Sequence, residues 1–147
     1  MKQLIFLCSV TALLCFSNNA YSQKSLTVAK VRSLDKLRIK NGDLTKFYPQ
    51  SPIPPNDKIY FGEMKVAKIG KRYYLLSTVQ NENRIFAFQL KKSWGKLKLK
   101  KYGHYTYSCD LKDKPVTLDV KYFVHGVEGN HLGCMEGMKT VSIFTKD

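Results

Sequence analysis

The chain of 147 residues lacks the short motifs by which common enzyme classes are recognised. It contains no G-x-S-x-G, no H-E-x-x-H, no phosphate-binding G-x-x-x-x-G-K-S/T and no evident pair of carboxylates. It also lacks low-complexity stretches, which excludes collagen-like and other fibrous classes. Because 44% of the residues are apolar, the chain can still bury a core and is not a disordered basic tail. We therefore assign no catalytic residue, no metal and no cofactor from the sequence.

Long apolar runs are absent except at the N-terminus. Lys2 is followed there by an uncharged run of 13 residues, Leu4 to Phe16, and then by a polar stretch. That run is shorter than the roughly 20 residues of a membrane-spanning helix. Ala20 and Ser22 are small residues at the positions that a signal peptidase reads, so the pattern predicts a secretory signal peptide over residues 1–22.

Removal of this signal peptide leaves one β-rich domain, residues 23–147, as an exported protein that is periplasmic or secreted. We expect no transmembrane segment in it.

Cysteine is scarce, and only Cys109 and Cys134 lie outside the predicted signal peptide. In an oxidising compartment two cysteines predict one disulfide, which here closes a loop of about 25 residues. The alternative is a zinc site formed by both cysteines with His125 and His131. Their spacing matches no paired zinc-ligand motif, so we expect the disulfide and no metal.

An alternation of apolar and polar residues dominates the rest of the chain and predicts half-buried strands. It is clearest from Val116 to Val124 and from Lys96 to Lys100. Five further segments alternate less strictly: Ile59 to Ile69, Arg72 to Val79, Arg84 to Leu90, Tyr102 to Cys109 and Lys139 to Thr145.

Short turns separate these strands, at Ile69-Gly70-Lys71, Gln80 to Glu82, Ser93-Trp94-Gly95 and Asp113-Lys114-Pro115. Connections this short join antiparallel neighbours. We predict a mainly β fold, a small antiparallel β-barrel or β-sandwich of about seven or eight strands in a meander, with one short N-terminal helix as an option.

Three segments are less regular. Ser25 to Lys40 is compatible with two strands or with a helix, and Asn41-Gly42 ends the element in both cases. Four prolines predict an extended loop over residues 49–55. Four glycines predict a second loop from His125 to Gly137.

Acidic residues are few, 11 against 25 lysines and arginines, which gives a net charge of +14. Such a charge attracts anionic partners. The segment from Lys91 to Lys101 is the most basic and contains no acid. Lys96, Lys98 and Lys100 are expected on one strand face in a row roughly 6.6 Å apart. The candidate binding residues are Lys91, Lys92, Trp94, Lys96, Lys98, Lys100, Lys101 and Tyr102.

The same lysine row is also compatible with a solvated outer face, or with an edge strand that lysines protect against aggregation.

Arginine is scarce as well, with four residues against 21 lysines. Arginine forks onto phosphate and stacks on bases, whereas lysine acts as a hydrated point charge. The stretch from Lys100 to Tyr107 loosely resembles the RNP1 strand of an RNA recognition motif, which implies aromatic stacking on RNA bases. The two helices of that fold are not evident, so we expect no sequence-specific nucleic-acid binding.

Three functions fit these features. The sequence favours an exported, non-enzymatic binding protein with a basic face, an inhibitor or immunity-type module that docks an acidic protein. The second hypothesis is adhesion to an anionic envelope polymer or membrane surface. The third is a small basic ribonuclease that uses His104, His125 and His131, with Lys101 holding the phosphate.

Overall fold

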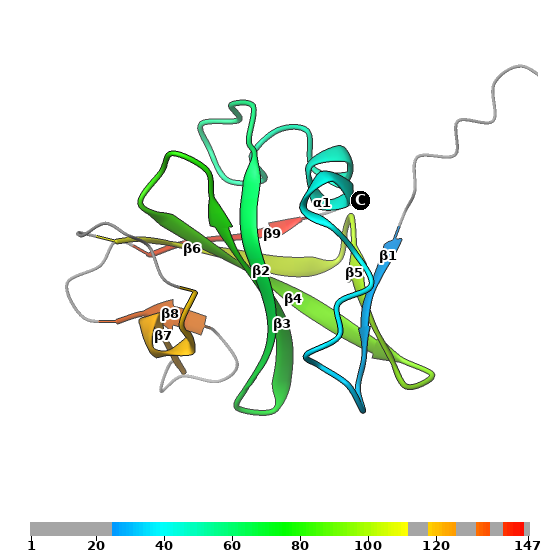
Figure 1. Cartoon of the computed structure of the whole chain (residues 1–147). Helices are drawn as coiled ribbons and strands as arrows, with labels where there is room; N and C mark the ends of the chain where they lie inside the picture. Colours follow the sequence, from blue (N-terminus) through cyan, green and yellow to red (C-terminus); the bar gives the residue numbers. More distant parts are fainter. Residues whose placement is uncertain (1–24, 112–117, 126–131, 136–139, 146–147) are drawn as a thin grey trace, which may run out of the picture.

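The alternating segments form strands of one curled antiparallel sheet (Figure 1). A computed structural model of the chain describes residues 25–111, 118–125, 132–135 and 140–145. The predicted signal peptide, the Asp113-Lys114-Pro115 turn and His131 lie outside these residues. The seven strands of this sheet are β1 (Ser25–Lys30), β2 (Phe61–Ile69), β3 (Arg72–Val79), β4 (Arg84–Ser93), β5 (Lys96–Lys100), β6 (His104–Asp110) and β9 (Thr140–Thr145).

A second, smaller sheet pairs β7 (Phe123–His125) with β8 (Leu132–Cys134). The mainly β, antiparallel, barrel-like or sandwich-like fold that the sequence predicts is therefore confirmed.

The strand order departs from a simple meander at β4. Strands β2 to β5 follow one another as hairpins, but β6 pairs with the first half of β4 rather than with β5. Strands β5 and β6 thus succeed each other along one edge of β4, with residues 101–103 between them. Beyond them, β1 pairs with β5 and β9 pairs with β6.

The central strands are buried on both faces, which explains their nearly continuous apolar sequences. On one side, here called the helix face, Leu75, Phe86 and Phe88 pack with Leu44 and Phe47 of the helix α1 (Asn41–Phe47).

On the other side, here called the hairpin face, Tyr74, Leu76 and Ile85 pack with Phe123 of β7 and Leu132 of β8. Two separate cores therefore lie on opposite sides of the same sheet.

The helix α1 starts where the sequence suggests that an element ends. Residues 31–40 form turns and irregular backbone after the strand β1, and the helix begins at Asn41. The Asp43 carboxylate accepts a hydrogen bond of 2.8 Å from the Lys40 backbone N–H, which satisfies a free donor at the helix start. The expectation of a terminator at Asn41-Gly42 is wrong because this cap and the burial of Leu44 favour a helix.

The clearest predicted strand, Val116 to Val124, is also largely wrong. Residues 116 and 117 lie outside the described part, Val120–Tyr122 form a 3₁₀ turn, and only Phe123–His125 are extended. The Asp119 side chain accepts from the Lys121 N–H at 3.0 Å, a local hydrogen bond that competes with strand pairing. The strand β8 then lies inside the segment predicted as a loop from His125 to Gly137.

The predicted disulfide is present between Cys109 of β6 and Cys134 of β8. It attaches the small β7–β8 sheet to the hairpin face, across a sequence separation of 25 residues. A loop of this length corresponds to on the order of 3 kcal/mol of stabilisation in the chain-entropy model. This covalent link is compatible with an extracellular protein. Within the described ranges, no helix has the length and apolarity needed to cross a membrane.

Candidate binding surface

One face of the strand β5 carries lysines only. Leu97 and Leu99 are fully buried on the helix face. Since successive side chains of a strand point to opposite sides, Lys96, Lys98 and Lys100 project from the other side of the sheet. Figure 1 shows the strand β5 on the right of the view, well away from β7 and β8 on the left.

Strand pairing extends this row sideways. Lys91 of β4 lies directly opposite Lys98, and Lys30 of β1 lies directly opposite Lys96. Directly opposed residues of antiparallel strands share a face, with Cβ atoms roughly 4.5–5.5 Å apart. We call these five residues the lysine face: Lys30, Lys91, Lys96, Lys98 and Lys100.

The other side chains on this surface are small or polar. The register places Ser25, Thr27, Ser93 and Gln89 between and beside the lysines. No apolar and no acidic side chain of β1, β5 or the second half of β4 joins them on this face.

Lys30 is not among the binding residues predicted from the sequence, and the reason is physical. Simple alternation places it on the same side as Leu26 and Val28, toward the core. A bulge between Thr27 and Ala29 shifts the register, so Val28 and Ala29 are both buried and Lys30 turns to the lysine face. The sequence of the segment offers no clear signal for such a bulge.

The remaining predicted binding residues lie around the lysine face rather than on it. Lys92 is exposed and pairs with Leu97, so it points to the helix side at the end of β4. Trp94 forms the tip of the β4–β5 turn, and Tyr102 is partly exposed in the loop before β6. Lys101 lines a groove. The structure therefore brings together four of the eight predicted residues, Lys91, Lys96, Lys98 and Lys100.

The groove at Lys101 adds positive charge beside the lysine face. It has a volume of about 700 Å³ and lies between the start of β1, residues 38–39 and α1. Arg38, Lys46 and Lys101 line it together with Asp43, whose carboxylate accepts from the Lys40 N–H. Three cations and one acid thus border an open space.

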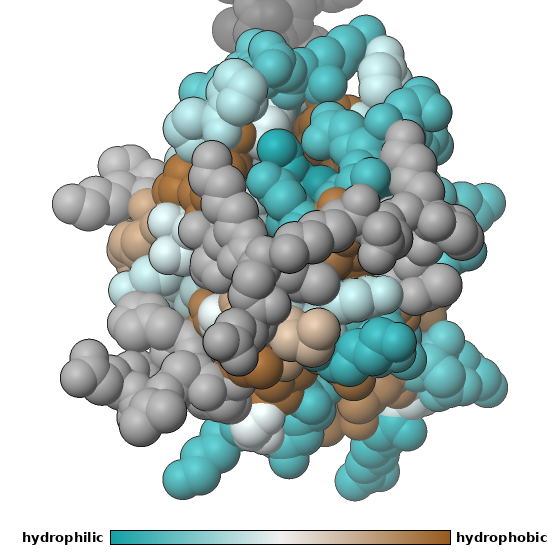
Figure 2. Space-filling model, turned by 90° about the vertical axis from the view of Figure 1, so that its left-hand side faces the viewer, coloured by the Kyte–Doolittle hydropathy of each residue, from teal (hydrophilic) through white to brown (hydrophobic). Residues whose placement is uncertain are grey.

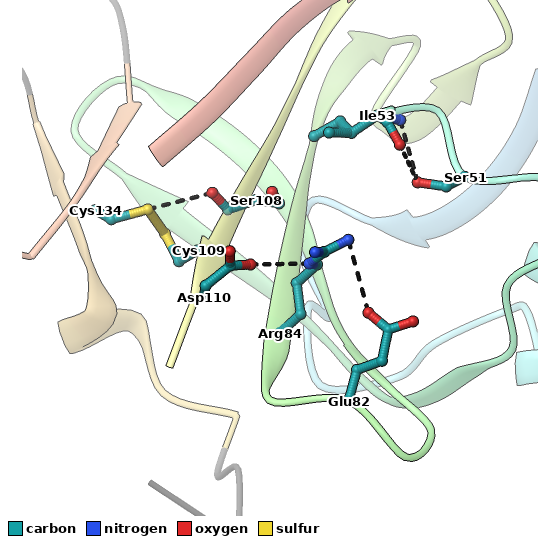
Figure 3. A network of polar contacts seen from close by, with 8 residues as sticks. All are labelled: Ser51, Ile53, Glu82, Arg84, Ser108, Cys109, Asp110 and Cys134. Atoms are coloured by element: carbon teal, nitrogen blue, oxygen red, sulfur yellow. Dashed lines mark hydrogen bonds and ion pairs between the residues drawn. A yellow bond between two sulfur atoms is a disulfide. The ribbon is translucent and has the colours of Figure 1, made fainter. Parts of the chain in front are cut away.

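Carboxylates pair with cations elsewhere. Arg84, at the start of β4, contacts Asp110 at 2.8 Å and Glu82 at 3.6 Å (Figure 3). The other ion pair found among the described residues joins Lys121 to Asp119. None of the described ion pairs involves the lysine face. Charge is therefore separated along β4, with acids near Arg84 and lysines at the far end.

Of the histidines in the ribonuclease hypothesis, His131 lies outside the described residues, and His104 lies on the opposite side of the sheet from the backbone of His125. His104 is 5% exposed on the helix face, and its Nε2 lies 3.0 Å from the Tyr48 hydroxyl and 3.3 Å from that of Thr106. Burial lowers the pKa of His104. The backbone of His125 belongs to β7, across the sheet on the hairpin face.

The Tyr48 hydroxyl also donates to the Lys100 carbonyl at 3.1 Å, so this polar cluster links the end of α1 to the junction of β5 and β6. The hydrogen bonds of His104 therefore hold the fold together at this junction.

Part of the exposed apolar surface lies around the small β7–β8 sheet, away from the lysine face. Val124 on β7 and Met135 after β8 are exposed. Figure 2 views that side and shows apolar residues between hydrophilic ones. The lysine face has no such residues.

Comparison with protein-family models, curated proteins and solved structures finds no match for this chain. Its function is therefore inferred from its own surface chemistry.

Proposed function

We propose that this is a non-enzymatic binding protein that attaches to an anionic surface of the cell envelope through its lysine face. The observation that supports the proposal is the arrangement of Lys30, Lys91, Lys96, Lys98 and Lys100 on one side of the sheet, where the described residues provide no carboxylate partner.

The lysine pairs repel one another in the free protein. Like charges directly opposite each other in a sheet are destabilising. An anionic layer lying over Lys91 and Lys98 neutralises both ammonium groups at once. Near an anionic membrane each lysine contributes about 1 kcal/mol, so five lysines give on the order of 5 kcal/mol at low ionic strength.

The composition of the face favours an extended surface over a pocket on one protein. Protein interfaces depend on central aromatic and apolar anchors and are depleted in lysine. The centre of the lysine face, around Lys98, contains only lysine, serine and threonine side chains. The lysine positions repeat at roughly 6.6 Å along a strand and roughly 4.8 Å across strands. A surface or polymer with repeated negative charges can therefore contact several ammonium groups at once.

An acidic protein partner, which the sequence favours, is the second candidate. The observation that supports it is Trp94, an exposed aromatic residue next to Lys96 that fits the chemistry of an anchor. We do not propose a ribonuclease, because His104 is buried and lies across the sheet from β7.

Salt dependence of binding tests the proposal. Binding of the exported protein to linear polyphosphate and to vesicles with about 30% phosphatidylglycerol should fall steeply as salt is raised. Lys91→Glu and Lys98→Glu should each lower the affinity at least tenfold. A matched control is Lys58→Glu, since Lys58 is exposed beside Glu82 and Arg84 at the opposite end of β4.

Equal losses in all three variants would show that net charge alone, and not the lysine face, determines binding. A complex of fixed ratio with one acidic protein that survives moderate salt would favour the second candidate.

A further inference from the structure

The β4–β5 turn contains a residue that is unfavourable for its backbone conformation. The turn has two residues, Trp94 and Gly95, with φ values of 49° and 70°. Positive φ at both positions defines the turn that Asn-Gly sequences prefer. Gly95 suits this conformation, but a bulky side chain at positive φ is strained. Trp94 is therefore a poor residue for folding at this position.

The same residue is almost entirely in water. Trp94 is the one tryptophan of the chain, and 97% of its surface is exposed. A Cβ atom added at Gly95 would meet nothing within 4 Å, so no other part of the described chain packs over the tip. The largest apolar side chain of the protein thus contributes nothing to its core.

The turn is nevertheless held in place. The Gly95 carbonyl accepts a hydrogen bond of 3.0 Å from the Val31 N–H, which ties the tip to the end of β1. Ser93 and Lys96 pair directly below the tip. The indole is therefore presented from an ordered hairpin.

The surroundings of the tip are cationic. Lys92 and Lys96 flank the turn in sequence, and Lys30 pairs with Lys96 on the neighbouring strand; all three are exposed. A tryptophan side chain has an apolar body and a polar N–H, and it is enriched where a membrane meets water. Lysines next to it favour anionic headgroups.

We propose that the β4–β5 tip is a membrane anchor. The indole of Trp94 enters the interfacial layer of an anionic bilayer, and Lys30, Lys92 and Lys96 contact headgroup phosphates. This inference rests on the proposed function, because it identifies the anionic surface as a lipid membrane.

Tryptophan fluorescence of the exported protein tests the anchor, because the one tryptophan of the chain is the reporter itself. Vesicles with about 30% phosphatidylglycerol should shift the emission of Trp94 to shorter wavelength and protect it from acrylamide. Vesicles of phosphatidylcholine alone should do so only weakly, because they offer no net charge to the lysines.

The variant Trp94→Asn separates a binding role from a structural one. Asparagine suits the turn, so the variant should melt at a higher temperature than the original protein. It should also bind the anionic vesicles at least tenfold more weakly while its affinity for linear polyphosphate is unchanged. All variants carry the same N-terminus, so that segment does not contribute to the differences.

The outcomes distinguish the two proposals. Unchanged vesicle binding by Trp94→Asn, or no spectral shift of Trp94 with vesicles, would overturn the membrane anchor. If the protein still binds polyphosphate, the proposed anion binding through the lysine face would stand. No binding to vesicles or to polyphosphate would overturn the proposed function itself. A shift with purified envelope proteins but not with lipid would place Trp94 in a protein pocket and also overturn the membrane anchor.

Discussion

Lys91 of β4 and Lys98 of β5 lie directly opposite each other on the lysine face, and neither forms an ion pair with any described residue. An acid at one of the two positions would stabilise the sheet by a cross-strand ion pair. Under the proposed function, the lysine pair stabilises a complex with an anion instead, at some expense to the free protein.

Lys91→Glu should therefore make the free protein more stable while it weakens binding. The gain in the free energy of unfolding should be about 0.2–1 kcal/mol, since a repulsive pair becomes an attractive one. Urea unfolding at low ionic strength measures it. The gain should shrink at about 0.5 M salt, where exposed charges are screened. A loss of stability in Lys91→Glu would contradict this account of the face.

The stability of the protein should fall in mildly acidic solution because of His104. Burial lowers the pKa of His104 below the ordinary value, so the unfolded chain binds its proton more readily than the folded one. The contribution is fully present above about pH 6.5 and is lost as the pH falls below it, by at most about 1.4 kcal/mol per pH unit.

His104→Gln should flatten this dependence, as urea unfolding between about pH 5 and pH 7.5 will show. Other titrating groups are the same in both proteins and cancel in the comparison. Identical slopes would mean that His104 is not protonated on unfolding.

The protein without its predicted signal peptide should contain no free thiol. Loss of the predicted signal peptide removes Cys8 and Cys15, and Cys109 is bonded to Cys134. Thiol titration in denaturant without reductant checks this. Mass spectrometry should confirm that the titrated chain begins at Gln23. Cys109→Ser with Cys134→Ser should lower the free energy of unfolding by about 3 kcal/mol. A reactive thiol in protein of that mass would argue against the disulfide.

Two glycines should respond oppositely to substitution by alanine. A Cβ at Gly62 would lie 2.5 Å from the Thr78 hydroxyl oxygen, which already accepts the Glu63 N–H at 2.9 Å. Gly62→Ala should cost about 1–3 kcal/mol of stability. Gly42 in α1 has open space, so Gly42→Ala should add up to about 1 kcal/mol. Thermal melting should show a lower melting temperature for Gly62→Ala and a higher one for Gly42→Ala than for the original protein. Changes in the same direction would be inconsistent with the described packing.

Much of the sheet could be predicted because strand alternation is a local property. Leu97 and Leu99 face the core and Lys96, Lys98 and Lys100 face away wherever β5 is placed in the sheet. The errors fall where short-range hydrogen bonds compete with alternation. Asp43 starts a helix after Lys40, and Asp119 holds a 3₁₀ turn inside a sequence that alternates well.

The candidate surface was only partly predictable, because it is formed by residues that lie far apart in the sequence. Lys30 and Lys96 are separated by more than sixty residues and meet because β1 pairs with β5. A one-residue bulge then decides which face Lys30 occupies. Trp94 was recognisable as a turn residue, but its full exposure and positive φ became evident only in the folded hairpin.

The excess of positive charge, the approximate positions of β2 to β6 and β9, the lysine row and the pairing of Cys109 with Cys134 could be read from the sequence. Three features became evident only in the folded protein. Strand β6 pairs with β4 instead of β5, and Lys30 and Lys91 extend the lysine row into a face. Glu82 and Asp110 lie with Arg84 at the far end of β4. The physical reason is that alternation depends on neighbours along one strand, whereas pairing and register depend on how all strands pack against two shared cores.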